Sequence, residues 1–159
     1  MIDRLDEFRR KEFTTETDPA TKERARKLSV RYRGITPDYT VYFTARSSTG
    51  HGSYDVAIQM VDYPEIADEE DLTVQEKVRL AIQGDLKVKC TCPAYRYWGF
   101  EYINTQLGSN VGDDQERYPY IRNPKLVGIL CKHAYQAMTV FPMIWNSIAS
   151  DIKNGRWLR

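Results

Sequence analysis

The stretch 86–92, Leu-Lys-Val-Lys-Cys-Thr-Cys, alternates apolar and polar side chains more cleanly than any other part of the 159-residue chain. Because successive side chains of a β-strand point to opposite faces, Cys90 and Cys92 are expected on the same face of this strand. Pro93 suits the first turn of a helix, and the aromatic-rich residues 94–106 are predicted to form that helix. The pattern therefore predicts a strand that ends with two thiols directed to the same side.

A second pair of metal-ligating side chains, Cys131 and His133, opens a later helix with Ala134, Ala137 and Met138 at helical spacing. Positions two apart inside a helix diverge by about 200°, so we expect Cys131 to be still extended and His133 to lie in the first turn. The two pairs use all three cysteines and one of the two histidines of the chain. Structural zinc prefers four such ligands in a tetrahedron, so Cys90, Cys92, Cys131 and His133 are predicted to bind Zn²⁺.

The predicted zinc site has four protein ligands and therefore no open position for water, which indicates a structural rather than a catalytic metal. The alternative interpretation is that the three cysteines are ordinary buried residues, as free cysteines often are. An odd number of cysteines argues against a disulfide framework.

The order C-x-C then C-x-H, strand first and helix last, resembles the SWIM-type zinc finger over about residues 86–140. The resemblance implies a zinc-bound module for contact with DNA or protein. The segments 92–102 and 122–133, together with the small size, look like the small stand-alone SWIM-containing proteins of tailed bacteriophages. That second resemblance implies a virion component of the head, neck or tail. The insert between the ligand pairs is longer than in compact SWIM fingers.

The rest of the chain predicts an α+β fold with a small antiparallel sheet, the zinc-clamped strand–helix unit and flanking helices. Alternation predicts strands at 30–33, 41–45 and 54–60, and the segment 47–53 with Gly50 and Gly52 reads as a hairpin loop. Thr73 and Glu76 fit a capping box for a helix to Gln83. We expect an N-terminal helical arm at 1–27, with a helix at 1–13 broken by 14–19. A single domain at 28–159 then contains the finger and a C-terminal helix that starts at Pro142 and ends at Gly155.

The aromatic segment after Cys92 supplies the candidate partner-binding residues. Helical spacing predicts that Tyr95, Trp98 and Tyr102 face the core. Tyr97 and Phe100 fall off that face, and we expect them, with Arg96 and Arg122, to contact a partner protein, because exposed aromatic side chains are enriched at interfaces. An alternative is a stacking platform for single-stranded nucleic acid.

Charge does not favour nucleic acid as the partner. The chain has 23 Lys and Arg against 22 Asp and Glu, a formal net charge of +1, and the charges of residues 93–130 balance. Basic clusters at 22–33 and 153–159 are interpreted as solvated faces or contacts to an acidic partner. The acidic stretch 62–76 lacks the ligand spacing of a calcium loop, so it is interpreted as solvated surface or as a contact for a neighbouring copy.

Several function classes have no support in the sequence. No apolar run reaches the roughly 20 residues of a membrane helix, and the charged N-terminus does not resemble a signal peptide, so we expect a cytoplasmic location. The resemblance to phage proteins implies that this is the host cytoplasm, followed by the virion. There is no phosphate-binding loop or dinucleotide fingerprint, and His51 is expected in a surface turn without a nucleophile. The sequence predicts a non-enzymatic, zinc-stabilised adaptor that binds other proteins and no small-molecule substrate. The alternatives are a SWIM-type nucleic-acid-binding module and, with an open zinc position, a metalloenzyme.

Overall fold

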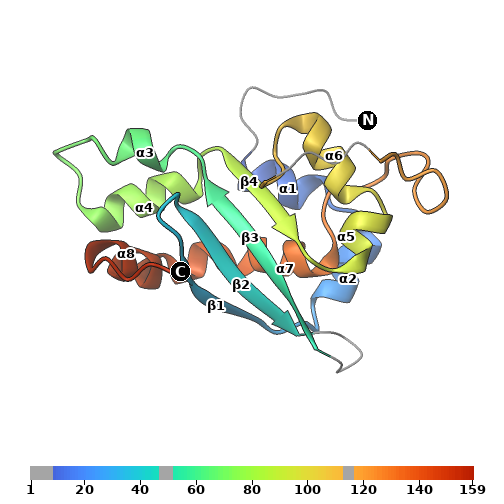
Figure 1. Ribbon diagram of the computed structural model, residues 1–159, viewed down its shortest axis with the longest axis horizontal. Helices are drawn as coiled ribbons and strands as arrows, with labels where there is room; N and C mark the ends of the chain where they lie inside the picture. Colours follow the sequence, from blue (N-terminus) through green and yellow to red (C-terminus); the bar gives the residue numbers. More distant parts are fainter. Residues whose placement is uncertain (1–8, 47–51, 113–116) are drawn as a thin grey trace.

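The computed structural model, which describes residues 9–46, 52–112 and 117–159, has a four-stranded sheet with helices around it (Figure 1). The strands are β1 (Val30–Ile35), β2 (Thr40–Arg46), β3 (Ser53–Met60) and β4 (Leu86–Cys90). They lie in the order β1-β2-β3-β4, and every neighbouring pair is antiparallel. The α+β prediction is thereby confirmed. The predicted loop residues 47–51, including His51, lie outside the described part of the chain.

Helices precede, interrupt and follow the strands along the chain. Their bounds are α1 (Arg10–Glu16), α2 (Pro19–Ala25), α3 (Tyr63–Ile66), α4 (Val74–Ile82), α5 (Pro93–Tyr97), α6 (Phe100–Leu107), α7 (Lys132–Val140), the 3₁₀ turn η1 (Phe141–Ile144) and α8 (Trp145–Lys153). α3 and α4 fall between β3 and β4 in the sequence, and α5 and α6 follow β4 directly. No helix among these described segments is long and apolar enough to cross a membrane.

The core lies between one face of the sheet and α7. On this face the alternate residues of β2, β3 and β4 are buried: Val41, Phe43, Ala45, Val56, Ile58, Met60, Leu86, Val88 and Cys90. α7 contacts all four strands, and α8 contacts β1 (Figure 1). The period of two in these strands thus decides which side chains the helix covers. The metal-ligand candidate Cys90 belongs to the same buried row.

The segment after β4 differs from the prediction of one helix over 94–106. Gly99 adopts φ of +79°, a left-handed conformation that L side chains rarely adopt, and it separates α5 from α6. Helical spacing therefore does not continue across this point. Tyr95 is fully buried as predicted, but Trp98 is 46% exposed, so the prediction that Trp98 faces the core is wrong.

The first helix ends later than predicted, although its break falls inside the predicted range 14–19. Thr14 and Thr15 belong to α1, and the chain turns at Thr17 and Asp18. The Asp18 carboxylate accepts a hydrogen bond from the Thr21 amide at 3.1 Å and so caps α2. Both helices pack on α7, with Phe13 completely buried. Residues 1–8 of the predicted first helix lie outside the described residues.

Candidate metal centre

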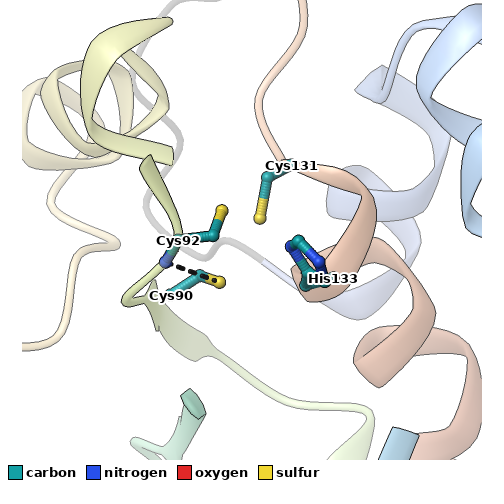
Figure 2. Close-up of side chains that lie close together, drawn as sticks. All are labelled: Cys90, Cys92, Cys131 and His133. Carbon is teal, nitrogen blue, oxygen red and sulfur yellow. Dashed lines mark hydrogen bonds between the residues drawn. The ribbon is translucent and has the colours of Figure 1, made fainter. Parts of the chain in front are cut away.

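Two chain segments that are far apart in sequence bring the four predicted ligands together. Cys90 is the last residue of β4, and Cys92 is the N-cap of α5 with extended backbone angles of −70° and 152°. Cys131 is the N-cap of α7, again extended, and His133 lies in its first turn. Figure 2 shows the Cys90–Cys92 pair on one side and the Cys131–His133 pair on the other, with the side chains directed toward one another.

The geometry of the four side chains fits a metal ion. One ligand atom from each residue lies within 4.8 Å of the other three. All four residues are buried, with exposed fractions of 1–3%. Three thiols and one imidazole form the donor set of a tetrahedral Cys₃His site. The four residues can therefore hold a metal ion.

The imidazole of His133 supplies an independent sign that a group is bound here. Both ring nitrogens, Nδ1 and Nε2, are buried and make no hydrogen bond within the described part of the chain. A buried polar atom without a partner costs about 1–3 kcal/mol, and native proteins rarely leave two on one side chain. A metal ion would remove this cost for the nitrogen that ligates it.

Two of the sulfurs accept backbone hydrogen bonds at the helix starts. The amide of Tyr95 donates to Cys92 Sγ at 3.4 Å, and the amide of Ala134 donates to Cys131 Sγ at 3.4 Å. The Cys92 amide also donates to Cys90 Sγ at 3.5 Å, the dashed line in Figure 2. N–H donors favour the thiolate over the thiol, and the thiolate is the form that binds metals.

The protein groups alone do not stabilise three thiolates. Hydrogen bonds from the thiols of Cys131 and Cys90 hold the pKa of Cys92 far below its usual range. Burial raises the pKa of Cys131 well above its usual value, and the neighbouring sulfurs raise it further. Burial and the nearness of the three sulfurs therefore oppose ionisation of all three thiols together, and a bound cation would favour their thiolate forms.

Two tyrosines that the sequence analysis did not connect with the site, Tyr54 and Tyr95, pack beside it or fix the elements that carry it. The ring of Tyr54 in β3 packs on His133 with 4.9 Å between centroids. Tyr95 Oη donates to the carbonyl of Val88 at 3.1 Å and lies 2.9 Å from Asn110 Oδ1, which ties α5 to β4 and to the segment beyond α6. Sequence alternation placed Tyr54 on a strand, but only the packing of α7 against β3 brings it beside the histidine.

The predicted partner-binding residues separate into two environments. Arg96, Tyr97 and Arg122 are exposed and line one hollow, whereas Phe100 is 6% exposed and belongs to the hydrophobic core. The α6 helix begins at Phe100 after the Gly99 break, and this turns the ring inward. Phe100 therefore does not lie on the surface formed by the other three residues.

The same hollow has members that the sequence analysis missed. Arg117, Tyr118, Pro119, Tyr120 and Ile121 complete its lining, and no acidic residue of the described chain is among them. Tyr120 is 78% and Ile121 is 91% exposed. Tyr118 and Tyr120, the aromatic pair around Pro119, were a signal in the sequence that the analysis did not use. We refer to residues 96–97 and 117–122 as the aromatic–arginine surface.

Comparison with known proteins adds no relative to this description. No family model, no curated protein and no solved structure matches the chain. The functional argument therefore depends on the geometry of the metal centre and on the surfaces around it.

Proposed function

We propose that Cys90, Cys92, Cys131 and His133 bind one structural Zn²⁺ in a SWIM-type arrangement, and that the protein is a non-enzymatic adaptor between other proteins. The convergence of four buried ligands from β4, α5 and α7 carries the proposal. Four protein ligands leave the ion without an open position, so zinc would supply cross-linking rather than Lewis-acid chemistry. The ion would join the end of β4 to the start of α7, the helix that covers the sheet.

The aromatic–arginine surface supports the adaptor role. Tyr, Trp and Arg are the residues that most often dominate the binding energy of protein interfaces. Here Tyr97 and Tyr120 are more than half exposed next to the guanidinium groups of Arg96 and Arg122. Neighbouring apolar side chains, Trp98 and Val127, are also exposed, at 46% and 57%. The resemblance to small SWIM-containing phage proteins makes a tailed-bacteriophage virion the proposed setting.

The zinc assignment is tested by elemental analysis of the purified protein. We expect about one zinc per chain, and loss of that zinc in Cys90→Ser and in His133→Ala. Lys132→Gln is the matched control, because it changes the residue between two ligands without removing a donor. Equal zinc content in the wild-type protein and both ligand variants would refute the assignment.

The adaptor role is tested by mass spectrometry of gradient-purified particles of the phage that encodes the chain. We expect the protein in the particles and cross-links from the aromatic–arginine surface to one neighbouring virion protein. A Tyr97→Ala/Arg122→Ala variant should keep its zinc and lose incorporation, because both side chains are exposed and neither is a proposed ligand. Particles that lack the protein, or a variant that is incorporated normally, would contradict this role.

A further inference from the structure

A positively charged region lies at the end of the sheet where β2 ends and β3 begins, close to α2 (Figure 1). Two hollows adjoin there, because both are lined by Ser29 and Arg46. The first also includes Arg31, and the second includes Arg24, Lys27 and Lys132. We refer to the region formed by the two hollows as the basic cleft. Its cationic residues come from α2, the connection to β1, β1 itself, β2 and α7.

The charge of the basic cleft is strongly one-sided. Its described lining contains the cations Arg24, Lys27, Arg31, Arg46 and Lys132 and one carboxylate, Glu23. That carboxylate is already paired with Arg26 at 3.1 Å. Asp55, which lies opposite Thr44 across β2 and β3, is paired with Arg33 at 2.9 Å. Arg24, Lys27 and Arg31 belong to the basic segment 22–33, and the fold adds Arg46 and Lys132 to them in a chain that is almost neutral as a whole.

The strand register places Arg31 and Arg46 of the basic cleft each opposite a residue with a hydroxyl group. Arg31 pairs with Thr44 across β1 and β2, and Arg46, two residues beyond Thr44, points to the same face. Arg46 in turn pairs with Ser53 of β3. Both arginines are exposed, and neither makes an ion pair within the described chain. Guanidinium and hydroxyl donors in one concave surface are suited to phosphate oxygens.

We propose that the basic cleft binds the phosphate backbone of a nucleic acid. The described residues of the lining include no aromatic ring for base stacking, so binding is expected to follow the backbone and not the sequence. The large exposed apolar side chains of the described chain lie elsewhere, which distinguishes the cleft from a membrane-inserting surface. This inference goes beyond the adaptor role, and it uses none of the metal ligands or the aromatic–arginine surface.

The test is fluorescence anisotropy with the full chain and labelled 20-nucleotide DNA, single-stranded and duplex, at 50 and 200 mM salt. If about four phosphates are neutralised, affinity for duplex should fall about 100-fold over this range, and somewhat less for the single strand. The two DNA arms distinguish which form supplies the backbone. No binding to either DNA at 50 mM salt would overturn the proposal.

The decisive variant is Arg31→Gln/Arg46→Gln, which removes two cations from the cleft. Its affinity at 50 mM salt should fall at least tenfold, and its salt slope should decrease by about two, because two fewer phosphates are neutralised. The matched control is Lys153→Gln/Arg159→Gln, which removes two cations at the end of the chain, outside the lining of the cleft. An equal effect of both double variants would overturn the assignment to this cleft.

Two other polyanions are included as competing outcomes. If vesicles with 30% phosphatidylserine bind the protein as tightly as DNA does, the ligand of the cleft is a lipid surface and not a nucleic acid. Self-association at 50 mM salt that the Arg31→Gln/Arg46→Gln variant abolishes, without DNA binding, would point instead to the acidic segment 65–71 of a second copy. Zinc content is measured in the same samples. DNA binding by a zinc-free but folded protein would separate a failure of the zinc assignment from a failure of this proposal.

Discussion

Gly99 is the residue at which the backbone leaves helical geometry between α5 and α6. A Cβ atom added there would lie 2.2 Å from Cγ of Pro119, a distance at which something must move. Asn123 also stabilises this turn, because its side-chain Nδ2 donates a hydrogen bond to the Trp98 carbonyl at 2.9 Å. One glycine thus permits both the left-handed backbone and the close approach of the 117–122 segment, which forms the aromatic–arginine surface.

Substitution of Gly99 separates these two effects. We expect Gly99→Ala to lower the free energy of unfolding by about 2–4 kcal/mol, because conformational strain of about 1–2 kcal/mol adds to the overlap with Pro119. Gly52→Ala is the matched control, since Gly52 has the same φ of +79° with no atom within 4 Å of the added Cβ. Urea unfolding measures both. Equal losses would show that Pro119 does not restrict this position.

Tyr32 links the first strand to the last helix. Its hydroxyl donates to Asp151 Oδ2 at 2.6 Å, and Arg156 Nε donates to the other carboxylate oxygen at 2.9 Å. Burial, together with the hydrogen bond to Asp151, raises the pKa of Tyr32 far above its usual value near 10. The folded state therefore keeps the phenol protonated at a pH at which the unfolded chain ionises.

This shift predicts how Tyr32 contributes to stability as pH rises. Because the folded-state pKa is the higher one, the contribution is complete below pH 10 and decreases above it. Tyr32→Phe should cost about 1–2 kcal/mol at pH 7 through loss of the hydrogen bond to a carboxylate. Its stability should then fall less than that of the wild-type protein between pH 9 and 11, as measured by urea unfolding. A larger fall in the variant would contradict the assignment.

At the scale of elements, α4 begins as its sequence predicts. Thr73 Oγ1 accepts a hydrogen bond from the Glu76 amide at 3.1 Å, and the Thr73 amide donates to the Glu76 carboxylate at 3.2 Å. The capping box depends on four consecutive residues only, so no distant contact is needed to specify it. Val78, Ala81 and Ile82 then face the core.

Thr73→Ala tests the capping box. We expect a loss of about 1 kcal/mol in the free energy of unfolding, because the Glu76 amide loses its side-chain acceptor. Thr73→Ser should lose much less, since the hydroxyl group is kept. Thermal unfolding of the two variants distinguishes a capping effect from a general intolerance of change at this exposed position. A Ser variant as unstable as the Ala variant would argue against the capping role.

At the scale of the whole molecule, the four ligand candidates connect parts that the core also joins. β4 and α7 already share buried apolar side chains, among them Val88, Ala134 and Met138. Zinc peptides without a core owe about 10–16 kcal/mol of folding free energy to the metal. In this protein the large hydrophobic core makes folding depend less on the metal, so the metal-free chain is expected to keep its sheet.

Metal removal should therefore lower the melting temperature without unfolding the chain at 25 °C. With zinc 100-fold above its dissociation constant, binding stabilises the fold by about 2.7 kcal/mol, which corresponds to about 5–10 °C for a chain of this size. The measurement is circular dichroism with and without a chelator, using Cys90→Ser as a variant that should not respond. A melting temperature of the wild-type protein that is indifferent to the chelator would remove the structural role of the metal.

The sequence was sufficient for features that depend on neighbours along the chain. Alternation located the strands, the Thr73 and Glu76 pair located the start of α4, and the spacing of Cys90 and Cys92 identified one half of the candidate metal centre. It also paired Cys131 with His133 through the geometry of a helix start. It failed at Trp98 and Phe100, because a single left-handed residue between them changed the phase of the helix.

Tertiary structure alone decided how separate segments meet. The approach of α7 to the end of β4 turned two ligand pairs into one cluster, and the register of β1 and β2 placed Arg46 near Arg31 in the basic cleft. The packing of Pro119 on Gly99 likewise built the aromatic–arginine surface. The physical reason is range: strand and helix periods act over a few residues, whereas these sites depend on backbone pairing and apolar burial between residues up to about a hundred positions apart.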